Sequence, residues 1–168
     1  MRVNPLMQSL LQSGAETEKP DDLPGELRDL VESGWKVGPA DSLVIAGCYG
    51  DGAGWRDDWQ AENVPQCEFE VNDVSIPCDD FPEERDSFLR SAVARSRAFA
   101  RAMLGAAAGL QHCELLVAIV SVGVDDDYFT HGATVKFATR RTGFPGVYGD
   151  LDRFQYEAMA SIEYCDVR

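Results

Sequence analysis

The sequence lacks the features that mark membrane, secreted and zinc-binding chains. No apolar run approaches the ~20 residues that a transmembrane helix needs, so no membrane contact is expected. The first eleven residues include Gln8 and Ser9 and have no sustained apolar core, which argues against a signal peptide there. The five cysteines are odd in number and form no C-x-x-C pair. They are therefore expected to be reduced, mostly buried thiols rather than disulfides or metal ligands.

Basic residues are also scarce, because 15 Lys and Arg face 29 Asp and Glu and leave a formal charge of −14. This excess argues against free nucleic acid or an anionic membrane as the main partner, since both are polyanions. It fits a protein that meets a basic surface or repels nucleic acid. The charge is uneven: residues 51–86 hold twelve acids and two arginines, and four arginines then follow without an acid until Glu114. The chain is expected to be dipolar, which suits head-to-tail contacts between copies.

The length of 168 residues is enough for one domain with a buried core. Residues 1–22 are expected to form an N-terminal arm and linker, with a short helix over 5–13 followed by a polar, acidic stretch. Residues 23–168 are expected to form a single α+β domain, with a second short helix over 24–33.

One long amphipathic helix over residues 80–104 is expected to organise this domain. Apolar residues recur through it at helical spacing and form one stripe. Asp80 is the expected N-cap, and Glu83 three residues later completes a capping box. Gly105 and Gly109 bracket the expected C-terminus.

Strands are expected on both sides of this helix. The segment 43–49 is apolar, 67–76 alternates as a half-exposed strand does, and 114–122 is apolar enough to be the central strand. Residues 132–139 and 154–165 also alternate, although a helix is the competing interpretation of the last segment. The order predicts an α+β fold with a mostly antiparallel sheet packed against one long helix, and with short N-terminal helices.

No catalytic signature stands out. The run Asp125–Asp127 and His131 offer oxygen and imidazole ligands to a divalent metal, but such a run after a strand is more typical of a solvated turn. Neighbours on a strand such as His112 and Cys113 point to opposite faces, which argues against a Cys–His nucleophile. The glycine-rich segment 50–54 lacks the Lys-Ser/Thr of a P-loop. We predict no catalytic, cofactor or metal site.

The arginines of the long helix are the first candidate interface. Arg90, Arg97 and Arg101 are spaced by seven and four residues, so they share one helix face, opposite much of the apolar stripe. In an isolated domain this row is a solvated face. In an assembly it can pair with the acidic segment 51–86 of a neighbouring copy and give a heterologous ring contact.

A second candidate interface is the acidic, tryptophan-bearing connection after the first apolar strand. Trp55 and Trp59 flank Asp57 and Asp58 there. Tryptophan is enriched among the residues that dominate binding energies at interfaces, so the pair can anchor a partner. The pair can equally cap the domain core, and both interpretations stay open.

Several features occur in a fixed order along residues 24–168. After an early helix, an apolar strand closes on a Tyr-Gly-Asp-Gly turn (44–52), an alternating strand follows (69–76), and an acidic link leads into an Ala/Arg helix (94–103). An apolar strand (115–122) and a final alternating strand (157–164) complete the series. This order and spacing resemble the tail terminator proteins of long-tailed, siphovirus-type bacteriophages, in the form seen in phages of high-GC Gram-positive hosts. The five cysteines, the N-terminal arm and the segment 142–152 depart from that pattern.

The resemblance implies a non-enzymatic structural protein of the virion neck, assembled in the host cytoplasm. Such proteins form a ring, commonly a hexamer, on the head-proximal end of the tail tube. The implied partners are further copies of the chain, the tail tube protein and the head–tail connector or head-completion protein. DNA would only pass through the lumen, and a negative lumen would keep its phosphates from docking.

Two other functions fit parts of the sequence. A small acidic immunity or antitoxin-like protein would neutralise a basic toxin, because opposite charge steers such pairs together. An enzyme would use Asp125 to His131 with a metal, and metal content after purification would identify it.

Overall fold

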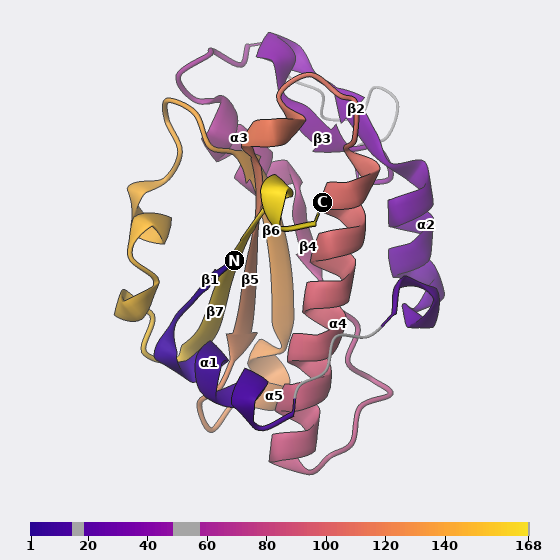
Figure 1. Cartoon of the computed structure of the whole chain (residues 1–168), viewed down its shortest axis with the longest axis vertical. Helices are drawn as coiled ribbons and strands as arrows, with labels where there is room; N and C mark the ends of the chain where they lie inside the picture. Colours follow the sequence, from indigo (N-terminus) through magenta and orange to yellow (C-terminus); the bar gives the residue numbers. More distant parts are fainter. Residues whose placement is uncertain (15–18, 49–57, 168) are drawn as a thin grey trace.

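The computed structural model describes residues 1–14, 19–48 and 58–167 (Figure 1). Within them a five-stranded antiparallel sheet has the order β1-β7-β5-β6-β4, and a separate antiparallel hairpin pairs β2 with β3. The strands are β1 (Arg2–Val3), β2 (Trp35–Val37), β3 (Leu43–Ile45), β4 (Asp73–Ser75), β5 (Leu116–Gly123), β6 (Ala133–Thr139) and β7 (Glu157–Glu163). The most apolar strand of the sequence, β5, is central, as predicted. The α+β class is confirmed.

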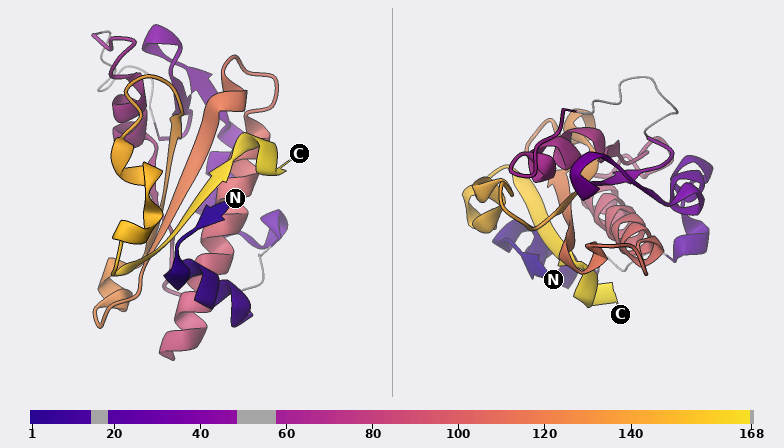
Figure 2. Two further views of the ribbon diagram at one scale, coloured as in Figure 1. Left: turned by 60° about the vertical axis from the view of Figure 1, so that its left-hand side comes forward. Right: turned by 90° about the horizontal axis from the view of Figure 1, so that it is seen from above.

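The predicted long helix is α4 (Arg85–Ala106), and it lies along one face of the sheet (Figures 1 and 2). The predicted capping box is wrong, because the N-cap is Glu84 rather than Asp80. The Glu84 carboxylate accepts the backbone N–H groups of Asp86 (3.1 Å) and Ser87 (2.8 Å). A carboxylate at this position satisfies two N–H groups that no helical carbonyl can reach.

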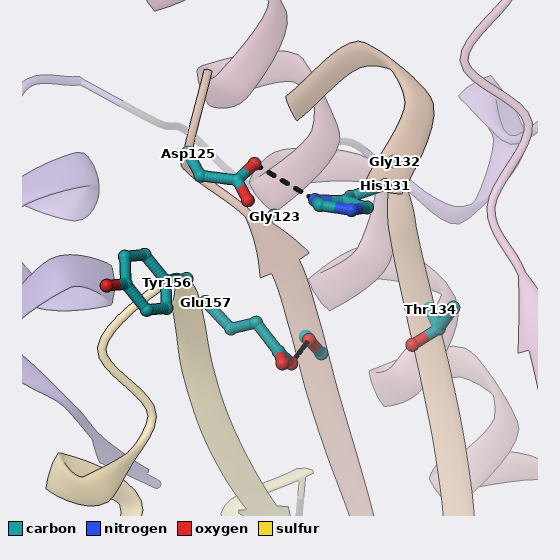
Figure 3. Close-up of a pocket in the computed structure, with 8 residues that line it drawn as sticks. Gly123, Asp125, His131, Gly132, Thr134, Tyr156 and Glu157 are labelled. Carbon is teal, nitrogen blue, oxygen red and sulfur yellow. Dashed lines mark hydrogen bonds and ion pairs between the residues drawn. The ribbon is translucent and has the colours of Figure 1, made fainter. Parts of the chain in front are cut away.

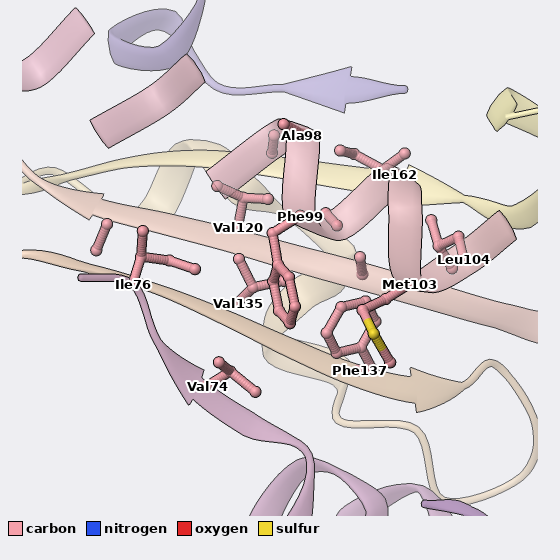
Figure 4. Close-up of a cluster of buried hydrophobic side chains, with 14 of the residues drawn as sticks. Val74, Ile76, Ala98, Phe99, Met103, Leu104, Val120, Val135, Phe137 and Ile162 are labelled. Carbon is pink, nitrogen blue, oxygen red and sulfur yellow. The ribbon is translucent and has the colours of Figure 1, made fainter. Parts of the chain in front are cut away.

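The main core fills the space between α4 and the sheet (Figure 4). Every second residue of β5, β6 and β7 points toward α4, as strand geometry requires. The rings of Phe99 on α4 and Phe137 on β6 meet edge to face, with centroids 6.0 Å apart. Both side chains are fully buried, and each such burial contributes about 1.5–3 kcal/mol to the free energy of unfolding.

Residues near the N-terminus are packed onto this core. Helices α1 (Pro5–Gln12) and α2 (Gly25–Ser33) match the predicted short helices. The segment that the sequence assigns to an arm contacts the domain directly, since β1 pairs with β7 and Met7 of α1 is fully buried. The buried side chain of Asn4 joins the two parts: its Oδ1 accepts the N–H groups of Met7 and Met159, each at 3.0 Å.

The strand predicted over residues 67–76 is wrong. The structure has helix α3 (Val64–Val71) there, and only β4 remains as a short edge strand. Pro65 in the first turn suits a helix start, where its missing N–H costs nothing. Glu68 and Asn72, one helical turn apart, are both fully buried and face the hairpin.

These two side chains of α3 bond to the outer edge of β3. Glu68 accepts the N–H of Leu43 (2.8 Å), while Asn72 accepts the N–H of Ile45 (2.9 Å) and donates to the Leu43 carbonyl (2.8 Å). Glu68 also accepts the N–H (2.6 Å) and the hydroxyl (2.7 Å) of Thr139 at the end of β6. Burial raises the pKa of Glu68, against the lowering effect of these hydrogen bonds. Helix α3 therefore joins the hairpin to the main sheet.

The sheet face that turns away from α4 is covered only in part (Figure 2). Residues of the segment between β6 and β7, together with Phe69 of α3, form a second, smaller apolar cluster against Val117, Ile119 and Met159.

The short helices are α5 (Tyr128–His131) and the 3-10 turns η1 (Pro20–Asp22), η2 (Pro39–Asp41), η3 (Cys113–Leu115), η4 (Gly146–Gly149), η5 (Leu151–Arg153) and η6 (Tyr164–Val167). No helix of the described residues is long and apolar enough to cross a membrane.

Candidate functional site

The three arginines of the predicted row lie on the least buried stripe of α4. Arg101 is exposed, whereas Arg90 and Arg97 are partly buried. The guanidinium of Arg90 donates to the hydroxyl of Ser87 at 3.0 Å. Burial lowers the pKa of Arg97, and the positive charge of Arg101 lowers it further. The exposed cation of the row is therefore Arg101, in the C-terminal half of the helix.

Arg95, on the same helix, has a structural role. Its side chain is 7 % exposed and forms a two-pronged ion pair with the Asp80 carboxylate, at 2.7 and 2.8 Å. It also donates to the Pro77 carbonyl (2.7 Å) and lies 4.1 Å from the centre of the Phe81 ring. This pair holds the segment before α4 against the helix, so Asp80 acts as a partner of Arg95 and not as a helix cap.

The tryptophan-bearing connection is described only from residue 58 onward. Trp55 and Asp57 lie outside the described residues. Trp59 is buried at 8 % exposure, and Asp58 is exposed. The low exposure of Trp59 leaves both interpretations of the tryptophan pair open.

The candidate metal and nucleophile residues do not gather into sites. Among the described residues, no group of three or more metal-ligating side chains comes together. His131 instead pairs through Nδ1 with Asp125 Oδ1 at 2.9 Å. His112 contacts Gln111 at 3.1 Å, and Cys113 is buried. The cysteines are less buried than predicted, since Cys48 and Cys165 are exposed.

A polar hollow of about 440 Å³ lies at the uncovered end of the sheet face opposite α4 (Figure 3). It is lined by residues from three neighbouring strands and the turns that join them: Ser121, Gly123, Asp125, His131, Gly132, Thr134, Tyr156 and Glu157. The strand register explains this grouping, because Thr134 is opposite Ser121 and Glu157 is opposite Gly123. We call this feature the polar hollow.

Two pairs of side chains fix the walls of the polar hollow. The hydroxyl of Ser121 donates a short hydrogen bond to the Glu157 carboxylate, and Asp125 holds His131 (Figure 3). Gly123 makes room for the second pair, since a Cβ at that position would lie 2.5 Å from the Cβ of His131. The hollow therefore offers two carboxylates and the hydroxyl groups of Ser121 and Thr134, while Tyr156, at 69 % exposure, lies at its rim.

Sequence reasoning singled out Asp125 and His131 but missed the rest of the hollow. Ser121, Thr134 and Glu157 become neighbours only through the pairing of β5 with β6 and β7, which no local pattern reveals. The available signal was their polarity within otherwise apolar strands, at positions that face away from the long helix.

Comparison with protein-family models, curated proteins and solved structures gives no match to this chain.

Proposed function

We propose that this protein is a virion structural protein of the tail terminator type. In this function, copies of the chain form a ring, a hexamer as the resemblance implies, on the head-proximal end of a phage tail tube. The ring ends tail polymerisation and joins the tail to the head–tail connector. The α+β architecture with one long helix is compatible with this function. The observation that carries the proposal is the separation of opposite charges on the surface.

One end of the molecule is acidic. The start of α4 and the turn between β5 and α5 lie together there, as the bond between the Tyr128 hydroxyl and the Glu83 carbonyl (3.3 Å) shows. We call this surface the acidic end, and its carboxylates are those of Asp79, Glu83, Glu84, Asp86, Asp125, Asp126 and Asp127. The polar hollow adjoins it through Asp125.

The accessible arginine lies far from the acidic end. A helix rises about 1.5 Å per residue, so Arg101 lies roughly 25 Å from Glu84 along α4. Ions screen charges over about 8 Å at physiological ionic strength, so these groups hardly interact within one copy. Between copies they can meet directly, and a contact between two different surfaces repeats head to tail until a ring closes.

The test is the mass of the purified protein by light scattering at about 50 mM and 500 mM salt, with negative-stain images of any oligomer. We expect ring-shaped oligomers at low salt that dissociate as salt screens the contact. The variant Arg97→Glu with Arg101→Glu is expected to remain monomeric.

The matched control is Lys19→Glu with Arg28→Glu, which changes the net charge equally at two exposed positions outside α4. This control is expected to assemble like the wild type. A protein that stays monomeric at every concentration and salt, or that binds a single basic partner one to one, contradicts the proposal and favours the immunity-like alternative.

A further inference from the structure

We propose that the polar hollow is the receiving site for an arginine side chain, that of Arg101, from a second copy of the chain. This inference rests on the proposed ring and names the surface that accepts its arginine row. The polar hollow takes the place of the acidic segment 51–86 as the surface that receives the arginine.

The chemistry of the hollow matches a guanidinium group. Arginine carries five N–H donors in a planar fork and no acceptor, and the hollow presents mainly acceptors. The carboxylates of Asp125 and Glu157 enter from different strand ends (Figure 3), and the hydroxyls of Ser121 and Thr134 follow Glu157 across the neighbouring strands β5 and β6. Among the described residues that line the hollow, no lysine or arginine supplies this charge from within the same copy.

The nearest lysine on this sheet face is committed elsewhere. Lys136, two residues along β6 from Thr134, bonds to Asp73 of β4 at 2.6 Å. His131, the one basic group in the lining, is already held by Asp125. The Glu157 carboxylate has only the Ser121 hydroxyl as a partner within the hollow, which leaves acceptor capacity for a cation.

Tyr156 borders the open side of the hollow. Its backbone carbonyl accepts the N–H of Val124 at 3.0 Å, and the residue is 69 % exposed. Its ring extends away from the carboxylates of Asp125 and Glu157 (Figure 3), which leaves the space beside them open to an arginine side chain. The hollow, at about 440 Å³, has room for such a side chain.

The same chain carries the complementary cation on its opposite side. Arg101 is exposed on α4, and α4 and the hollow lie on opposite faces of the sheet. The acid near Arg101 is Asp166, and it already binds the Met1 ammonium group (2.5 Å) and the Glu163 N–H (2.8 Å). Two complementary surfaces on opposite faces produce a heterologous contact, which is what a closed ring of identical copies requires.

The test uses Asp125→Asn with Glu157→Gln, which removes both charges from the hollow and keeps the shape of each side chain. We expect this double variant to raise the dissociation constant of the subunit contact about 30-fold or more, as measured by analytical ultracentrifugation. The control is Asp29→Asn with Glu32→Gln, an equal charge change in exposed residues of α2 that belong neither to the acidic end nor to the lining of the hollow. Circular dichroism melting establishes that all variants fold.

Mixing two variants gives the sharper result. The first has the hollow substitutions and an intact arginine row, and the second has Arg97→Glu with Arg101→Glu and an intact hollow. Each alone is expected to be monomeric, but their mixture has one working contact and should stop at one-to-one dimers. If wild-type rings form and the hollow variant weakens them no more than the control does, the inference is wrong while the ring stands. If the wild type never assembles, both proposals fail.

Discussion

Replacing Asn72 by alanine removes one of the two buried side chains, with Glu68, that bond the edge of β3 to the rest of the domain. Three hydrogen bonds disappear: one from Ile45 N–H (2.9 Å), one to the Leu43 carbonyl (2.8 Å) and one to the Phe137 carbonyl (3.3 Å). Asn72 is fully buried, so water cannot replace the lost partner. Each buried backbone group left without a hydrogen bond costs about 1–3 kcal/mol.

We take the two shorter bonds as the ones that decide the outcome. Their loss predicts a decrease of about 2–6 kcal/mol in the free energy of unfolding, a large part of the 5–15 kcal/mol typical of a domain. Urea unfolding followed by circular dichroism measures this quantity. The control is Asn63→Ala at the exposed start of α3, where Asn63 Oδ1 accepts only the N–H of Gln60 (2.8 Å). If Asn72→Ala costs no more than this control, the side chain does not anchor the hairpin and the reasoning is refuted.

Three further perturbations test other parts of the structure. Gly143→Ala should lower the free energy of unfolding by at least about 2 kcal/mol in urea titrations, because φ is +90° and a Cβ would lie 1.9 Å from the Glu62 carbonyl oxygen. The control is Gly149→Ala, which has open space around it and should change the free energy of unfolding by less than about 0.5 kcal/mol. The hydrogen bond from Arg95 lowers the pKa of Asp80, so the stabilising effect of this pair is present above the unfolded pKa of about 3.9 and is lost as the pH falls through the folded value. Asp80→Asn should therefore cost about 1 kcal/mol at pH 7 and less as the pH falls, and a cost that does not decrease with falling pH would contradict this. Burial raises the pKa of Cys78 to about 11, so iodoacetamide at pH 8 should alkylate exposed Cys165 well before Cys78 in mass spectra of the native protein.

Regular apolar patterns predicted the main elements of the fold correctly. The long helix, the central strand β5 and the strand β6 all have patterns that agree with their burial. The patterns failed where polar residues are buried. In residues 67–76 the alternation of Cys67, Phe69 and Val71 indicates a strand, but the bonds of Glu68 and Asn72 to β3 and β6 require a helical turn between them.

The candidate site was predictable only in part, for a similar reason. The Arg90, Arg97 and Arg101 row follows from helix periodicity, and the structure places all three on one stripe of α4. The polar hollow depends on strand register, so Glu157 could not be connected with Ser121, 36 residues earlier in the chain, before the pairing was known. The predicted N-cap was wrong because several acidic residues precede the helix. Asp80 bonds to Arg95, and Glu84 caps the helix.

The brevity of the two outer strands has a consequence for the protein at high concentration. Strand β1 has two residues and β4 has three, and these are the strands that border the five-stranded sheet. A border this short exposes few backbone groups to a foreign strand, so it is a poor template for amyloid-like stacking. Any ordered contact between copies at this border would therefore depend on side chains more than on strand pairing.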